Sequence, residues 1–125
     1  MAKNDYNRIV CLILTYLYAR LQGEQETSPE SFLQPMTKDF PIPEEYFFFI
    51  LESMAKEDLI DGISFVKAWG GDIINISDMS RIRITPNGIR YLTENKTMRG
   101  VLEWLRDHAV DMPGMVTTVL GILND

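Results

Sequence analysis

The segment from Tyr6 to Leu21 constrains the fold most, because its apolar residues do not form a single helical stripe. They are Tyr6, Ile9, Val10, Leu12, Ile13, Leu14, Tyr16, Leu17 and Leu21. A helix that is apolar on nearly every side is buried by neighbours on more than one side. Asn4 or Asp5 is expected to cap this helix, and Gly23 to stop it after about Gln22. We therefore expect a central helix in contact with a second element, such as the C-terminal tail or another subunit.

A short helix is predicted next. Pro29 suits its first position, and Phe32, Leu33 and Met36 supply an apolar face. Pro35 limits this helix to a turn or two, because proline cannot donate the backbone hydrogen bond that a longer helix needs.

A third helix is predicted to begin near Pro43 and to run to about Glu57, with Glu44 and Glu45 in its favourable first turn. At about 100° per residue, its buried stripe is expected to hold Phe47, Ile50, Leu51, Met54 and Asp58. The outward side is expected to carry Glu45, Phe49, Glu52 and Lys56, with Phe48 and Ser53 on the flanks.

Three consecutive phenylalanines, Phe47, Phe48 and Phe49, stand out in this helix. They cannot all face one core, so Phe48 or Phe49 needs another environment. Two interpretations remain open. Either the short second helix or the tail covers the extra ring, or the ring belongs to an exposed patch that binds a protein.

After residue 58 the pattern changes to β. The segment from Leu59 to Trp69 predicts a strand, Gly70-Gly71-Asp72 predicts a turn, and residues 73–76 predict the returning strand. Arg81 to Ile84 alternates with period two, which places two arginines on one face and two isoleucines on the other. It stays open whether the hairpin turns at Gly70-Gly71, and whether Arg81 to Ile84 forms a separate strand.

Three helices are predicted to complete the chain. Thr85 is expected to cap the first, which has Pro86 at its first position and ends near Asn95. The others are expected from Thr97 to about Ala109 and from Asp111 onward. The last one carries Met115, Val116, Val119, Leu120, Ile122 and Leu123. Because it is too apolar to be left in water, it is expected to pack on its own domain or on a partner copy.

The order of helix, short helix, helix, hairpin and further helices is that of an α+β winged helix-turn-helix with a two- to three-stranded hairpin wing and additional C-terminal helices. We expect a winged-helix domain over residues 1–97 and a helical extension over residues 98–125. The same order also describes other small α+β folds.

The stretch from Ile84 to Asn95 has the form hydrophobic-T-x-x-G-x-x-Y-L-x-x-N, a pattern that recurs after the wing in winged-helix proteins. With the helix that ends at Gly23 and the segment Asp58 to Ile63, it makes residues from Asp5 to about Thr97 resemble the YjcQ family. These are small winged-helix proteins of Gram-positive bacteria and their phages. The resemblance implies the fold, an association with phages or prophages, and DNA binding as the default expectation.

Charge, cysteine content and hydropathy limit which partners the protein is expected to bind and in which cellular compartment it is expected. The net charge of −6 disfavours general affinity for phosphate backbones. The single cysteine, Cys11, excludes an internal disulfide and fits a reducing compartment. No run of apolar residues is long enough to span a membrane, and the N-terminal run is followed by no small-residue cleavage site. We therefore expect a cytoplasmic protein that binds no membrane.

The charges are distributed unevenly along the chain. From Glu24 to Asp61 ten acids stand against two bases, a local net of −8, which argues against insertion of the third helix into a DNA groove. The next cluster is basic. Candidate phosphate contacts are Arg81, Arg83, Arg90, Lys96 and Arg99, together with Lys56 on the third helix. The alternative is an ordinary solvated face whose bases pair with nearby acids.

Catalytic chemistry is not expected. His108 is the only histidine and lies beside Asp107, which excludes the usual multi-histidine metal sites. Cys11 lies in a hydrophobic run and is interpreted as a core residue. Glu44-Glu45 and Glu57-Asp58 are neighbours that point apart on a helix, so neither is an acid/base pair. No cofactor site and no small-molecule substrate are expected.

We therefore expect a non-enzymatic binding module, either a transcriptional regulator or a phage-associated protein that binds double-stranded DNA through its wing. The alternative is a protein-interaction or dimerisation module that keeps the winged-helix frame without binding DNA. Its expected interaction patch is Phe48, Phe49, Met115, Val119 and Ile122. A homodimer through the first and last helices is a hypothesis that rests on their apolar surplus.

Overall fold

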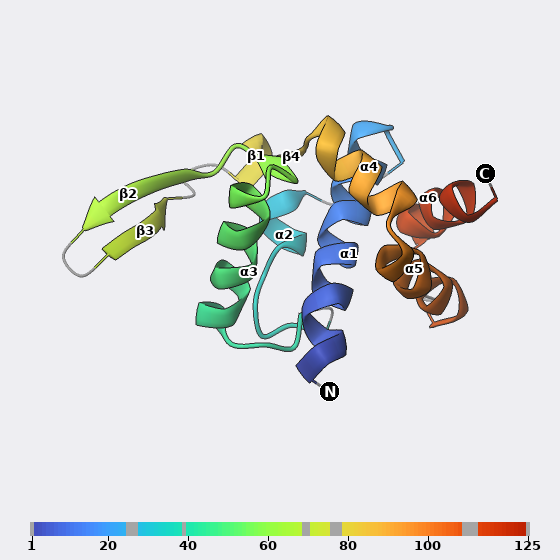
Figure 1. Ribbon diagram of the computed structural model, residues 1–125, viewed down its shortest axis with the longest axis horizontal. Helices are drawn as coiled ribbons and strands as arrows, with labels where there is room; N and C mark the ends of the chain where they lie inside the picture. Colours follow the sequence, from blue (N-terminus) through green and yellow to red (C-terminus); the bar gives the residue numbers. More distant parts are fainter. Residues whose placement is uncertain are drawn as a thin grey trace.

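The computed structural model describes residues 2–24, 28–38, 40–68, 71–75, 79–108 and 113–124. Within these ranges, the helices pack together around α1, and two small antiparallel sheets lie at one side of them (Figure 1). The fold is therefore α+β. The helices are α1 (Ala2–Leu21), α2 (Pro29–Phe32), α3 (Glu44–Lys56), α4 (Pro86–Glu94), α5 (Lys96–His108) and α6 (Pro113–Leu123). The strands are β1 (Ile60–Asp61), β2 (Ser64–Ala68), β3 (Gly71–Asn75) and β4 (Arg83–Ile84), and the 3-10 helix η1 (Met79–Arg81) precedes β4.

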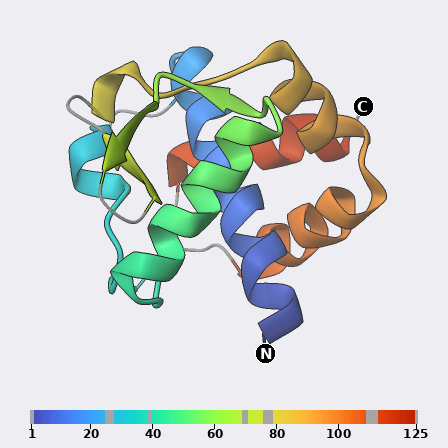
Figure 2. The same cartoon turned by 60° about the vertical axis from the view of Figure 1, so that its left-hand side comes forward.

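Helix α1 is the centre of the core. Every residue from Ile9 to Leu17 is buried, and so is Ala19. The helix contacts α3 and β4 as well as α4, α5 and α6, and Figures 1 and 2 show α5 and α6 on the side of α1 that faces away from α3. The prediction of a helix buried on more than one side is confirmed, and elements of the same chain cover it.

The C-terminal end of α1 follows from local backbone chemistry. Gly23 adopts a positive φ of 79°, and its amide donates to the Arg20 carbonyl at 3.1 Å. The Glu24 amide donates to the Ala19 carbonyl at 2.8 Å, which completes the paired bonds of a glycine-ended helix. The stop at Gly23 is confirmed. The start differs from the prediction, because α1 begins at Ala2 and already includes Asn4 and Asp5.

A chain of aromatic contacts joins α1, α2 and α3. The rings of Tyr16 and Phe32 stack at 4.3 Å, and Phe32 meets Phe40 edge-on at 5.2 Å. Phe40 meets Phe47 at 5.3 Å, and Phe48 lies against Phe47 at 5.8 Å. Such edge-to-face contacts suit the opposite partial charges of ring face and ring edge. The connector between α2 and α3 is therefore tied into the core through Phe40.

Two residues expected on apolar faces are exposed instead. Met36 follows α2 with a φ of 62° and is 75% exposed, so it lies outside the apolar face assigned to it. Asp58 was placed on the buried stripe of the third helix, but α3 ends at Lys56 and Asp58 has a φ of 61° in the connection that follows. The rest of that stripe is confirmed as buried: Phe47, Ile50, Leu51 and Met54.

All four strands lie in the segment that connects α3 to α4. β1 pairs antiparallel with β4, with Ile60 opposite Ile84, and β2 pairs antiparallel with β3. Figure 1 shows β2 and β3 projecting away from the helices as a hairpin. Arg83 and Ile84 therefore do form a separate short strand. The strand expected from residue 59 to residue 69 is interrupted at Gly62, where φ is +91° and an added Cβ would stand 2.6 Å from the Arg81 carbonyl carbon.

The turn of the hairpin is shifted from its expected place. Gly71 and Asp72 lie in β3, opposite Ala68 and Lys67, whereas they were expected within the turn. Residues 69–70, between the two paired strands, lie outside the described residues, as do residues 76–78. The outward arginines and inward isoleucines predicted for residues 81–84 are confirmed, because Arg81 and Arg83 are exposed and Ile82 and Ile84 are buried.

Helices α5 and α6 pack on α1, and α5 also packs on α4. The side chain of Asn95 caps α5 by accepting from the amides of Thr97 at 2.9 Å and Met98 at 3.1 Å. Helix α6 contacts α1 and α5, and residues 109–112, where two helix ends were predicted, lie outside the described residues. In the part of the chain that is described, no helix combines the length and apolar character needed to cross a membrane.

Candidate interaction surfaces

The motif from Ile84 to Asn95 forms a structural junction. The Thr85 hydroxyl accepts a hydrogen bond from the Gly88 amide at 2.9 Å and donates one to the Asp58 carbonyl. The Thr85 amide donates to the Leu59 carbonyl at 3.1 Å. The first turn of α4 is therefore tied to the connection between α3 and β1, as the predicted Thr85 cap and Pro86 start allow.

Asn87 adds to this junction. Its side-chain amide donates to the Glu57 carbonyl at 3.2 Å, so both Thr85 and Asn87 satisfy carbonyls that follow the end of α3. Carbonyls at a helix C-terminus lack partners within the helix, and leaving them unpaired is costly. The hydrogen bonds of this motif therefore stabilise the junction between α3, β1 and α4, and they give no indication of a binding site.

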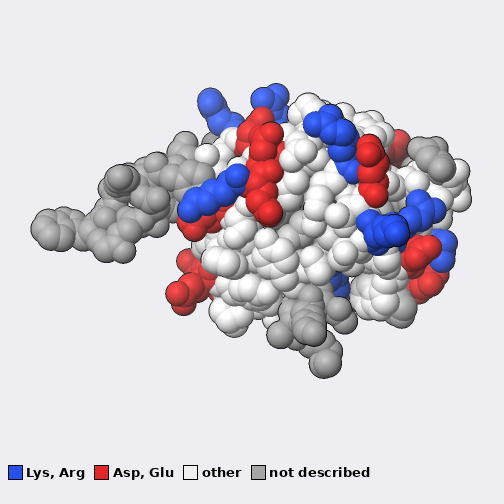
Figure 3. Space-filling view, in the orientation of Figure 1, with Lys and Arg blue, Asp and Glu red and all other residues white. Residues whose placement is uncertain are grey.

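All five bases expected to touch phosphates between residues 81 and 99 are exposed. Arg83 lies 3.7 Å from the Asp61 carboxylate, and Arg99 donates to the Leu123 carbonyl at the end of α6 at 3.0 Å. The remaining members of this group are Arg81, Arg90 and Lys96. Figure 3 shows basic side chains alternating with acidic ones over β1, β4, α4 and α5, so this face of the molecule carries no continuous positive field.

Lys56, the base on α3 assigned to the same contacts, belongs to a different surface. Its Nζ lies 3.8 Å from the Glu52 carboxylate one helical turn earlier. Such exposed pairs contribute little to stability, but they do reduce the positive charge that Lys56 could offer a phosphate. Acidic side chains dominate the outer side of α3 in Figure 3.

The three consecutive phenylalanines occupy three environments. Phe47 is fully buried, Phe48 is half-buried against it, and Phe49 is 55% exposed on the outer side of α3. The ring of Phe49 lies nearly parallel to that of Tyr46, with 6.4 Å between centroids and 20° between planes. The exposed aromatic patch is therefore centred on Phe49 and Tyr46, and Tyr46 was not singled out from the sequence.

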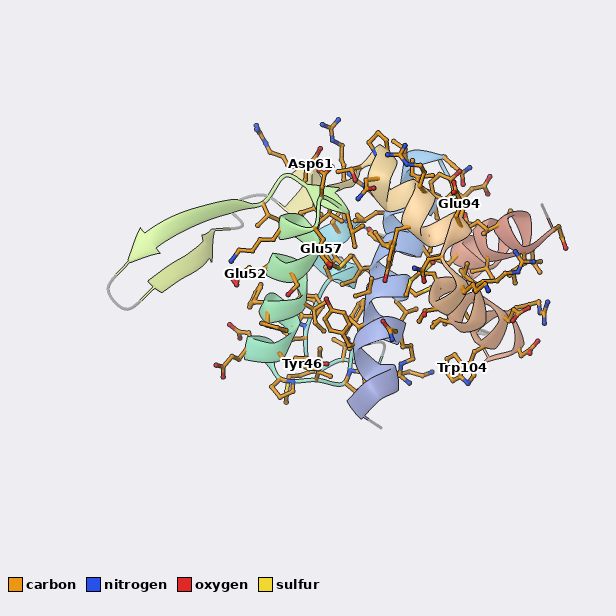
Figure 4. The ribbon with its side chains drawn as sticks, viewed as in Figure 1. Tyr46, Glu52, Glu57, Asp61, Glu94 and Trp104 are labelled. Carbon is orange, nitrogen blue, oxygen red and sulfur yellow. The ribbon has the colours of Figure 1, made fainter. Side chains whose placement is uncertain are left out.

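We call the side chains of Tyr46, Phe49, Ser53 and Glu57 the α3 face. Their spacing of three and four residues places them along one side of the helix. Figure 4 shows Tyr46 and Glu57 near opposite ends of α3. Tyr6 of α1 and Tyr91 of α4 border this face, as their electrostatic interactions with Glu57 show.

The bordering tyrosines report the charge of this face. Burial is the largest cause that raises the pKa of Tyr6, and the Glu57 carboxylate raises it further, while a hydrogen bond with Ser53 acts in the opposite direction. Burial and then Glu57 also raise the pKa of Tyr91. A carboxylate disfavours a second negative charge nearby. The Glu57 carboxylate therefore places negative charge beside both tyrosines.

The other half of the expected interaction patch is buried within the chain. Met115 is 1% exposed, Val119 is 2% exposed and Ile122 is 7% exposed, because α6 packs on α1 and α5. These three residues therefore offer little surface to a partner in this fold. The apolar surplus of the first and last helices, which motivated a dimer, is satisfied by contacts inside one chain.

Cys11 lies in the core at 3.9 Å from the Thr15 hydroxyl. Burial raises the pKa of its thiol to about 12, and the contact with Thr15 acts in the opposite direction. The side chain of His108 lies outside the described residues. Among the described residues, no three histidine, cysteine or acidic side chains converge as metal ligands would.

A cleft of about 480 Å³ lies between the end of α1, α4 and α6. Its lining is polar and comprises Tyr18, Gln22, Glu24, Thr93, Thr117, Thr118, Gly121 and Ile122. Thr118 is 5% exposed, and its hydroxyl has no hydrogen-bond partner within the described part of the chain.

Comparison with known proteins places the chain in a family without naming an activity. No curated protein and no solved structure matches it. The family model described as YjcQ protein matches residues 12–108. That match runs past Thr97, where the resemblance was expected to end, and takes in α5. Since it covers well over half of the chain, the protein belongs to the YjcQ family.

Proposed function

We propose that this protein is a non-enzymatic, cytoplasmic winged-helix module that binds a partner protein through the α3 face. The winged-helix assignment rests on the chain order of α1, α2 and α3 followed by strands β1 to β4, and on the projecting hairpin of β2 and β3 (Figure 1). In such a frame, the third helix is the element that DNA-binding members lay in the major groove.

The exposed ring of Phe49 carries the proposal. It is 55% exposed and lies beside Tyr46 on the helix that corresponds to a recognition helix. Aromatic side chains that stay in water on a regular helix are typical of interfaces, where their burial supplies binding energy. The acidic neighbours Glu45 and Glu52 disfavour a phosphate backbone at the same place.

The test compares Phe49→Ser with Met36→Ser. Both replace an exposed apolar side chain, but Met36 lies in the connection after α2 and outside the α3 face. The tagged wild type and both variants are incubated with an extract of the native host, and captured proteins are quantified. We expect a protein that is retained by the wild type and by Met36→Ser and is lost from Phe49→Ser.

Circular dichroism of the two variants checks that each remains helical. Capture of the same proteins in equal amounts by all three chains would refute the α3 face as the binding surface. An extract in which the wild type retains nothing above a tag-only control would also count against the proposal.

DNA binding is the second candidate, and the exposure of Arg81, Arg83, Arg90 and Lys96 favours it. In this version the hairpin and the arginines beside it touch phosphates, and the protein acts as a transcriptional regulator or a phage-associated factor. Binding of a random duplex at about 50 mM salt should then weaken steeply as salt rises. Arg81→Ala combined with Arg83→Ala should weaken it, whereas Arg106→Ala on α5 should not. Absence of any binding at low salt removes this candidate.

A further inference from the structure

The α3 face combines aromatic rings with negative charge. Tyr46 and Phe49 present two nearly parallel rings, and Ser53 and Glu57 continue the same side of the helix. Glu57 is exposed, and the phenols of Tyr6 and Tyr91 both interact with its carboxylate. A segment that lies along this stripe can place one cation on the rings and another beside the Glu57 carboxylate.

The surroundings strengthen the negative field. Glu44 and Glu45 are exposed in the first turn of α3, at the end of the helix that carries Tyr46. Lys56 is the base that α3 contributes, and Glu52 already lies 3.8 Å from it. An acidic partner segment would be repelled by this field, and a neutral one would gain nothing from it. A positively charged segment would gain from both the rings and the carboxylates.

Arginine fits this combination best. Its guanidinium is planar, stacks on aromatic rings and pairs with carboxylates through several donors. Lysine can pair with Glu57, but its compact ammonium does not stack in the same way.

We propose that the partner segment recognised by the α3 face is basic, and that one arginine from it lies on the Tyr46–Phe49 rings while a second basic residue pairs with Glu57, which lies about 12 Å further along the helix than Phe49. This inference rests on the proposed protein-binding function and specifies the chemistry of the partner. A second copy of this chain is a poorer occupant, because two chains that each carry a net charge of −6 repel one another.

The test uses short fluorescein-labelled peptides of alternating arginine and alanine, with lysine–alanine and glutamate–alanine peptides of equal length. Binding to the whole chain is followed by fluorescence anisotropy at about 50 mM salt, where screening is weak. We expect the arginine peptide to bind more tightly than the lysine peptide, and the glutamate peptide not to bind. Amide chemical shifts should change in α3 and not in α6.

Variants then separate the rings from general charge. Phe49→Ser and Glu57→Gln should each weaken binding of the arginine peptide about two- to fivefold, as expected for a partly exposed cation–π contact or ion pair. Glu103→Gln removes an exposed carboxylate from α5 and should leave the affinity unchanged. If Glu103→Gln has the same effect as Glu57→Gln, or Phe49→Ser has none, the attraction is unspecific and the proposal fails.

The outcomes distinguish this inference from the proposed function. A host protein captured in a Phe49-dependent manner, together with no binding of the arginine peptide, overturns the basic partner while the α3 face stands. If the wild type captures no protein and binds no arginine peptide, both the proposed function and the basic partner are overturned. A dimer in light scattering that Phe49→Ser dissociates would assign the face to a second copy and would overturn the basic partner.

Discussion

Gly88 in the first turn of α4 lies directly against the backbone of Leu59. An added Cβ on residue 88 would collide with the Leu59 carbonyl oxygen and would stand 2.8 Å from the Ile84 Cγ1 atom. The same Leu59 carbonyl accepts a hydrogen bond from the Thr85 amide at 3.1 Å. This contact holds the start of α4 beside β1, where Ile60 pairs with Ile84.

Gly88→Ala is expected to destabilise the protein by about 2 kcal/mol or more, because the collision is with backbone that cannot rotate away. Gly100→Ala is the matched control, since an added Cβ there meets no described atom within 4 Å. That variant should gain up to about 1 kcal/mol from its better helix propensity. Urea unfolding of both variants measures the difference. Equal stabilities would show that the α4 junction is looser than described.

Thr85→Ala should lower the free energy of unfolding by about 1–2 kcal/mol, because it removes the helix cap and the bond to the Asp58 carbonyl together. Thr85→Ser keeps the hydroxyl and should retain most of the stability. The midpoints of urea denaturation rank the three proteins. Serine and alanine variants of equal stability would show that the hydroxyl contributes nothing and that only packing is lost.

Thr118→Val is expected to leave stability unchanged or to raise it by up to about 1 kcal/mol. The substitution keeps the side-chain shape and removes a buried hydroxyl that has no partner within the described residues. Thr117→Val on the exposed side of α6 serves as the control and should change little. A clear loss on Thr118→Val in thermal unfolding would mean that its hydroxyl is bonded in solution.

The Cys11 thiol should be unreactive in the folded protein, because burial raises its pKa from 9.0 to about 12. In the unfolded chain the thiol ionises near its ordinary pKa, whereas in the folded chain it stays protonated. The contribution of the protonated Cys11 thiol to the free energy of unfolding is thus complete below about pH 9 and is lost as pH rises through the folded pKa. The raised pKa values of Tyr6 and Tyr91 act in the same direction.

Two measurements check this expectation. A thiol reagent at about pH 8 should label Cys11 slowly in buffer and rapidly in urea. Urea unfolding repeated at about pH 10.5 should show lower stability, with a smaller decline in Cys11→Ala. Rapid labelling of the folded protein would contradict the buried position.

The chain should be a monomer at micromolar concentration, because α6 already covers α1 within one chain. Met115, Val119 and Ile122 are buried, and among the described side chains of α6 Leu120, at 39% exposure, is the large apolar one left in water. Light scattering should therefore report the mass of a single chain. A concentration-dependent rise to twice that mass would restore the dimer hypothesis.

Local features of the fold were accessible from the sequence. The stop of α1 at Gly23, the Thr85 cap and the buried stripe of α3 were predicted correctly, because each depends on residues within a turn or two of one another. Met36 and Asp58 were misplaced because a helical spacing was extended past positions where the backbone adopts a positive φ and leaves the helix.

The candidate surface required knowledge of distant contacts. The spacing along α3 identified Phe48 and Phe49 as rings without an obvious core, but only the fold distinguishes half-buried Phe48 from exposed Phe49. Tyr6 and Tyr91, which border Glu57, come from α1 and α4, which are far from α3 in the sequence. No pattern within α3 could have brought them together.

By itself, the sequence determined the order of the helices and strands, the approximate extent of most helices, and that α1 had to be buried on several sides. Periodicity and capping are local properties, so neighbouring residues carry them. The tertiary structure decided what covers α1, which phenylalanine stays in water and which acids remain on the surface. Those outcomes depend on contacts between residues far apart in the chain, and α6 shows this most clearly: its apolar face fits a partner copy or its own core equally well until the packing against α1 and α5 is known.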